Sequence, residues 1–209
     1  MDSVPSASAL TGLVSTSSAA PDAGINEIGE LILAEHARIL RLFGALYDLA
    51  RRADPSVSRL ALAQVWTRLA GLLVTHTRAE EEICFPPMCG TGARTLTVVE
   101  AAAADHIDIR EAVEQARLLE VGSARWWQMI TRARMACTEH FASEERGLVS
   151  ALCSGLPPGT GKVLVRQWAA FAVSQAEGSP GLGIGREHDD ADRAAGCLPG
   201  ALFRRVSPR

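Results

Sequence analysis

Four of the five histidines in this chain follow a regular pattern, and two of them have a glutamate four residues further on. The residues are, in order, His36, His76 with Glu80, His106, and His140 with Glu144. The intervals between them are each about as long as one helix plus a turn. Residues four apart in an α-helix share a face, with their Cβ atoms roughly 5–6 Å apart. Each His-x-x-x-Glu pair can therefore direct an imidazole and a carboxylate at one point, which predicts a metal cage built by four helices.

The rest of the chain predicts an all-α protein. Apolar residues recur at helical spacing in four long segments, at about residues 26–53, 57–85, 95–121 and 124–152. Pro86-Pro87 is expected to end the second segment, and Ser123 to cap the fourth. Long helices with short connections are typical of an up-down-up-down antiparallel four-helix bundle. A shorter fifth helix, at about 162–176, is expected to dock on the outside of this bundle.

Composition divides the chain into a bundle with two tails. Residues 1–24 are rich in Ser, Ala and Pro, and residues 178–209 are rich in Gly, Asp and Arg, so both are predicted to be disordered. The bundle is assigned to residues 25–153, and a loop with an accessory helix to residues 154–177. The N-terminus lacks the basic segment of a secretory signal, and no apolar run reaches the ~18 residues that span a bilayer. We therefore expect a cytoplasmic protein without membrane association.

The charge of the chain gives no electrostatic reason for binding nucleic acid. The formal net charge is −3 and the sequence pI is about 6.0. The sequence has no stripe of Lys and Arg of the kind that contacts phosphates. Nucleic acid is therefore not among the expected partners.

The predicted helix faces place the six patterned residues inside the bundle. His36 lies on an apolar stripe with Ile32 and Leu40, and the other five lie in line with the apolar residues of their own helices. A buried, unpaired carboxylate costs several kcal/mol or becomes protonated, and no Lys or Arg lies on these stripes. A bound cation would remove that cost. Imidazole and carboxylate donors favour iron, with manganese and zinc as the alternatives, over calcium and magnesium.

The number of donors predicts two ions. Four imidazoles and two bidentate carboxylates supply about eight donor atoms, which is more than one six-coordinate ion accepts. Two ions bridged by Glu80 and Glu144 would use all of them. An additional oxo or hydroxo bridge would leave room for an exogenous ligand.

The order His, His-x-x-x-Glu, His, His-x-x-x-Glu on four helices resembles the hemerythrin-like, or HHE cation-binding, domain over about residues 25–153. The resemblance implies a non-haem di-iron centre that binds, senses or turns over oxygen, peroxide or nitric oxide. It implies that the four histidines are ligands and that Glu80 and Glu144 are the bridging carboxylates. An enzyme of this kind would be an oxidoreductase, for example one that decomposes peroxide. The alternatives are a non-enzymatic iron or oxygen sensing or storage module acting through a protein partner or as an oligomer, and a metal-free structural bundle.

Two positions depart from the pattern of the oxygen-carrying hemerythrins. Those proteins have a second histidine one turn after the third-helix ligand, where this chain has Arg110. Their last carboxylate is an aspartate five residues after its histidine, where this chain has Glu144 four residues after His140. The missing imidazole argues against reversible oxygen carriage. Glu35 and Glu81 are spare carboxylates near the motifs, and we expect them to support ligands or lie at the surface rather than bind metal.

Overall fold

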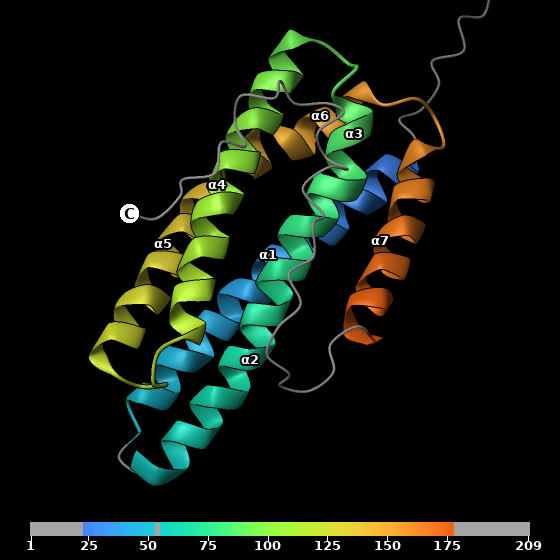
Figure 1. Cartoon of the computed structure of the whole chain (residues 1–209). Coiled ribbons are helices and arrows are strands. Elements are labelled where there is room, and N and C mark those ends of the chain that lie inside the picture. The colour runs from blue at the N-terminus through green and yellow to red at the C-terminus, as the bar shows by residue number, and fades with distance from the viewer. Residues whose placement is uncertain (1–22, 53–54, 178–209) are drawn as a thin grey trace, which may run out of the picture.

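The computed structural model describes residues 23–52 and 55–177, and these residues are helical with no strand among them (Figure 1). The elements are α1 (Ala23–Ala50), α2 (Pro55–Ala79), the π-helix η1 (Glu80–Cys84), α3 (Phe85–Met88), α4 (Ala93–Arg117), α5 (Ala124–Arg146), α6 (Leu148–Gly155) and α7 (Thr160–Glu177). The predicted all-α class is confirmed. No described helix has the length and apolar character needed to cross a membrane.

The four long helices α1, α2, α4 and α5 form the predicted bundle (Figure 1). α1 packs against α2, and α4 packs against α5, while α2–α4 and α1–α5 contacts close the ring. The predicted cap at the start of α5 is also present, because the Ser123 hydroxyl accepts a hydrogen bond from the backbone N–H of Trp126 at 3.2 Å. This cap provides an acceptor for one of the free N–H groups at the start of α5, and it marks the end of the connection from α4.

A polar layer divides the apolar core of the bundle into two parts. On α1, for example, buried Ile32 belongs to one apolar cluster and buried Ile39 to the other, with His36 between them. α2 and α4 repeat this order, whereas the buried apolar residues of α5 belong to one cluster and those of α6 to the other. Leu40 was predicted to share the inward stripe but is 39% exposed, because the helix turns Ile39 inward at that level instead. The polar layer crosses the bundle where the predicted metal cage should lie.

The second long segment does not end at Pro86-Pro87 as predicted. It continues through η1 and α3 as far as Met88. Proline clashes with the carbonyl four residues earlier and has no N–H to donate, so the turn before it must widen. Here the backbone N–H of Phe85 bonds to the carbonyl of Glu80, five residues back. The result is a π-helical turn at the level of the polar layer, a position where such turns often serve a functional site.

The fourth predicted segment, 124–152, is two helices rather than one. α5 ends at Arg146 and α6 begins at Leu148, and Gly147 between them adopts φ −112° and ψ −70°. A Cβ atom at Gly147 would lie 3.4 Å from the Val98 side chain of α4 and 3.4 Å from the Ser143 carbonyl. Glycine therefore allows close approach of α4 at the bend.

The predicted fifth helix is α7, which docks mainly on α1 and also contacts α2 and η1. Its Leu164 and Trp168 are buried, one turn apart on the inward face. The predicted boundary between residues 153 and 154 falls within α6, and residues 23 and 24 of the predicted N-terminal tail belong to α1. The remainder of that tail, and the predicted tail at 178–209, lie outside the described residues.

Candidate metal centre

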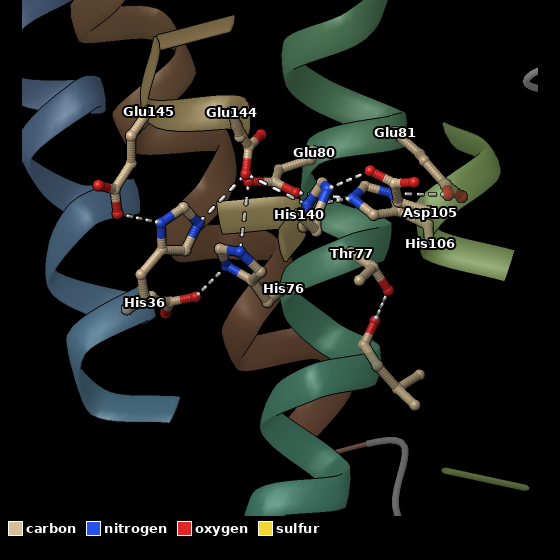
Figure 2. A network of polar contacts seen from close by, with 12 residues as sticks. His36, His76, Thr77, Glu80, Glu81, Asp105, His106, His140, Glu144 and Glu145 are labelled. Carbon is tan, nitrogen blue, oxygen red and sulfur yellow. Dashed lines mark hydrogen bonds and ion pairs between the residues drawn. The ribbon is translucent and has the colours of Figure 1, made fainter. Parts of the chain in front are cut away.

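The structure brings all six predicted ligands together in the polar layer (Figure 2). None of them is more than 2% exposed. They come from α1, α2, η1, α4 and α5 and are His36, His76, Glu80, His106, His140 and Glu144. A single buried cluster thus unites residues that are far apart in the chain.

Glu80 lies between two groups of candidate donors. One group is His36, His76, Glu80 and Glu144, and the other is Glu80, His106 and His140, with the donor atoms of each group within 4.8 Å of one another. Glu80 Oε1 lies 3.3 Å from His76 Nε2, and Oε2 lies 3.1 Å from His106 Nε2. One oxygen of this carboxylate therefore faces each group, which is the geometry of a bridging ligand.

Glu144, on α5, also contacts a histidine from each of the two groups. Its Oε2 lies 3.2 Å from His36 Nε2 and 3.3 Å from His140 Nε2. His140 Nε2 in turn lies 3.1 Å from His106 Nε2. The Nε2 atoms of all four rings thus point to the centre, and two carboxylates lie among them (Figure 2).

Most of the donor atoms at the centre lack hydrogen bonds within the described chain. Both oxygens of Glu80, both oxygens of Glu144, and the Nε2 atoms of His36 and His76 are buried without such a partner. Leaving a buried polar atom unpaired costs about 1–3 kcal/mol, and more when the group is charged. A cation coordinated by these atoms would satisfy them, so the donor set fits a metal ion.

Each histidine is held on its outer side by a carboxylate. The Nδ1 atoms lie 2.9–3.3 Å from these oxygens, in the pairs His36–Glu145, His76–Glu35, His106–Glu81 and His140–Asp105. A carboxylate that accepts a hydrogen bond from Nδ1–H leaves the lone pair of Nε2 directed inward and increases its donor strength. The outer carboxylates therefore favour the tautomer that binds a metal.

Sequence reasoning noted Glu35 and Glu81 but missed Asp105 and Glu145. All four carboxylates are directly next to a candidate ligand in the sequence. Each supports a histidine on another helix, so that Glu35 of α1 bonds to His76 of α2, for example. The sequence signal that could have found them is the acidic residue directly next to a candidate ligand in each motif. Consecutive side chains on a helix point about 100° apart, so the neighbour of an inward ligand can face the adjacent helix.

Arg110 lies outside the ring of donor atoms. Its Nη1 donates to Glu81 Oε1 at 2.7 Å, and the same oxygen accepts from His106 Nδ1 at 2.9 Å. Burial raises the pKa of Glu81, but the contacts with His106 and Arg110 outweigh burial and hold that pKa below its ordinary value. Where the oxygen carriers have a fifth imidazole, this chain has a guanidinium that supports the outer partner of His106. Glu81 therefore acts on the outer side of the ring, and not as a candidate ligand.

The pKa values of the two central carboxyl groups are shifted in opposite directions when no metal is bound. Burial, and then the charge of Glu144, raises the pKa of Glu80 well above its ordinary value. Burial acts in the same direction on Glu144, but its contacts with His140 and His36 outweigh it and hold the pKa well below the ordinary value. Burial lowers the pKa of His140, but Glu144 and Asp105 outweigh it and the pKa is raised. Cations must displace the protons that these groups hold, so acid should weaken metal binding.

In the metal-free protein, His106 is expected to titrate at a pH of about 4. Burial disfavours its charged form and lowers its pKa from 6.5 to about 4, although Glu81 opposes the shift. Because the folded pKa lies below the unfolded one, the unfolded chain binds this proton more tightly. The contribution of His106 is present above pH 6.5 and is lost as the pH falls towards 4, by about 3 kcal/mol in all. An NMR titration of the His106 ring in metal-free protein measures the midpoint, and a midpoint at or above 6.5 would contradict the expectation.

Comparison with known proteins gives one match. Residues 27–152 fit the family model of the hemerythrin HHE cation-binding domain, which is more than half of the chain. No curated protein and no solved structure matches this chain. The matched segment begins in α1, ends in α6 and includes all six candidate ligands, whereas α7 lies beyond it. The match and the buried cluster of imidazoles and carboxylates together support metal binding at this centre.

Proposed function

The chain belongs to the hemerythrin HHE cation-binding family, and from this premise we propose that it is a non-haem di-iron protein that binds, senses or turns over oxygen, peroxide or nitric oxide. The observation that carries the proposal is the position of Glu80, whose two oxygens face two separate groups of histidines at 3.3 and 3.1 Å. A carboxylate placed in this way serves two ions better than one. The six candidate residues would be the protein ligands of that pair.

The donor chemistry favours iron for this pair. Four imidazoles and two carboxylates form a mixed nitrogen and oxygen set, which suits iron, manganese or zinc and does not suit calcium or magnesium. Among these metals, iron and manganese change oxidation state. When bound, two iron ions would supply electrons and an open coordination position to a small oxidant. The family is defined by cation binding, so the choice of iron is part of the proposal.

The surroundings of the centre favour a very small exogenous ligand. The Phe141 ring stacks on His36 at 3.8 Å between centroids, and the Phe85 ring stacks on His106 at 5.6 Å. Apolar clusters lie on both sides of the polar layer. The donor atoms are thus buried between apolar groups, which favours a small ligand over an organic substrate. Diatomic molecules and peroxide meet this limit.

Two of the outer carboxylates extend from the buried centre to solvent. Asp105 Oδ2 lies 3.3 Å from His140 Nδ1, and Glu145 Oε1 lies 3.1 Å from His36 Nδ1. Both carboxylate side chains are 46% exposed, whereas the two rings are buried. Each pair therefore connects a buried imidazole with solvent. Because Nε2 of each ring would be bound to metal, these two carboxylates fix the orientation of the rings rather than deliver protons to the exogenous ligand.

Anaerobic loading with Fe(II) tests the proposal. We expect two iron ions per chain and a new charge-transfer absorption band when oxygen, peroxide or nitric oxide is added. With peroxide, a catalyst would release oxygen, because two molecules of peroxide give one of oxygen and two of water. The variant His140→Ala, which removes a candidate ligand, should lose both the band and the turnover.

The possible results separate the candidate functions. A band without turnover would favour the sensing or storage alternative, in which a protein partner reads the state of the centre. No iron binding, or one ion per chain, would overturn the di-iron proposal. Two bound ions that respond to none of the three small molecules would overturn the proposed ligand class.

A further inference from the structure

Helix α7 contributes to the wall of the metal centre, although it lies beyond the residues that match the family. Its Trp168 is 2% exposed, and the centre of its ring lies 5.7 Å from that of His76, with 65° between the two planes. Leu164, one turn earlier, is also buried and packs in the same apolar cluster. Because α7 packs against α1, α2 and η1, this face covers the outside of the bundle beside a candidate ligand.

Ring contacts from the bundle itself cover the other three histidines. The described aromatic partners of His36, His106 and His140 are Phe85, Phe141 and other histidines of the centre. Trp168 is the described ring that reaches a candidate ligand from outside the family segment. Phe141 of the bundle also contacts His76, at 5.8 Å between ring centroids, so Trp168 and Phe141 together cover this ligand. Entry beside Trp168 would leave the four helices of the bundle in place.

A surface groove is formed by α7 and by η1. It lies between η1 and α7, has a volume of about 430 Å³, and is lined by Glu82, Ile83, Gln167, Ala170, Phe171 and Ser174. Ile83 is only three residues after Glu80, and Gln167 is directly followed by Trp168. The groove thus runs along the outer side of the two elements that separate the centre from solvent at His76.

Packing alone holds the indole of Trp168 in place. Its Nε1 atom is buried and has no hydrogen-bond partner among the described residues. A buried donor without a partner costs stability, so the N–H group of this ring does not help to hold the ring in place. A ring without a polar anchor can rotate or withdraw at lower cost than one held by a hydrogen bond.

We propose that Trp168 is the access gate of the metal centre and sets how fast ions and small ligands pass between the η1–α7 groove and the candidate ligands. This inference rests on the proposed function, because it takes the six buried residues as a centre that exchanges metal and ligand. Trp168 is a residue that controls entry, and hence the size of molecule admitted, rather than a catalytic residue. The gate belongs to the segment that the family model does not include.

Co(II) is a suitable probe, since its visible absorption reports binding without relying on iron chemistry. In the full chain, Trp168→Ala should increase both the rate of Co(II) uptake and the rate of its extraction by EDTA, each by about tenfold. The equilibrium Kd should remain nearly constant, because a gate changes the barrier and not the end states. Azide binding to the Co(II)-loaded protein should accelerate in parallel. Trp168→Phe retains most of the ring and should behave like the wild type.

Matched variants keep the test decisive. Val173→Ala, at an exposed position of the same helix, should change neither rate. Trp168→Leu retains an apolar side chain and should give intermediate rates if Trp168→Ala folds poorly, which thermal melting detects. Faster extraction with unchanged uptake would show that Trp168 only stabilises the loaded state, and would overturn the gate. Unchanged rates in a protein that binds two Co(II) ions would overturn the gate alone, whereas failure to bind any metal would overturn the proposed function as well.

Discussion

Replacing Glu80 by glutamine is expected to abolish metal binding, whereas replacing His106 by glutamine should leave one ion per chain. Glu80 belongs to both groups of candidate donors, but His106 belongs to only one. Glutamine retains the volume of Glu80 and removes the negative charge that would offset two cations in a buried site. The loss of one bridging carboxylate should therefore affect both positions. The group formed by His36, His76 and Glu144 with Glu80 stays complete when His106 is replaced.

Elemental analysis of protein loaded with excess metal and then passed over a desalting column measures this difference. The expected stoichiometry is two ions for the wild type, one for His106→Gln and none for Glu80→Gln. Glu82→Gln is the matched control, because Glu82 is an exposed glutamate of the same π-helix and lies in neither donor group. Two ions retained in Glu80→Gln, or equal stoichiometries in the Glu80 and His106 variants, would contradict the bridging role.

The periodicity of the sequence was sufficient to predict the bundle and to bring six candidate ligands together. A residue's face on a long helix follows from its spacing, and a carboxylate on an apolar face needs a partner wherever the helix lies. His76 and Glu80 could thus be placed inside the bundle from a single segment. Helix packing determines which of these residues lie next to one another. The candidate ligands could be chosen without knowing that packing.

Other features depend on tertiary contacts that periodicity does not encode. The π-helical turn arises from the clash of a proline with an earlier carbonyl, and the sequence signal of Pro86-Pro87 indicated a helix end as readily as a widened turn. The fifth helix was predicted from its spacing, but spacing within α7 cannot say that the ring of Trp168 faces His76. The docking of one helix on another depends on the shape of both surfaces.

The outer carboxylates connect the centre with the assembly of the bundle. Asp105 of α4 holds His140 of α5, and Glu145 of α5 holds His36 of α1. A histidine is therefore correctly oriented only when the helix that carries its carboxylate is also in place. Metal binding should for this reason favour the packed arrangement of all four helices together, and not the folding of any one of them.

Removing the metal is therefore expected to lower the melting temperature of the protein by about 10 °C or more. A ligand present at 1,000 times its Kd stabilises the folded state by about 4 kcal/mol, and 1 kcal/mol shifts the melting temperature of a domain of this size by about 2–4 °C. The physical source is the set of buried oxygens and nitrogens that have no hydrogen bonds without an ion. Thermal unfolding followed by circular dichroism, with and without a saturating metal, measures the shift.

The Glu80→Gln variant separates the effect of the cation from the effect of packing. The pKa of Glu80 is raised well above its ordinary value by burial and by Glu144, which favours the neutral form of its side chain in the metal-free wild type, and the amide of the variant is also neutral. The two metal-free proteins should consequently melt within a few degrees of each other, and added metal should stabilise only the wild type. If the variant gained the same increase on adding metal, the ions would be binding elsewhere. If the metal-free variant were much less stable, Glu80 would be contributing to packing, and the loss of metal in that variant could no longer be attributed to its carboxylate.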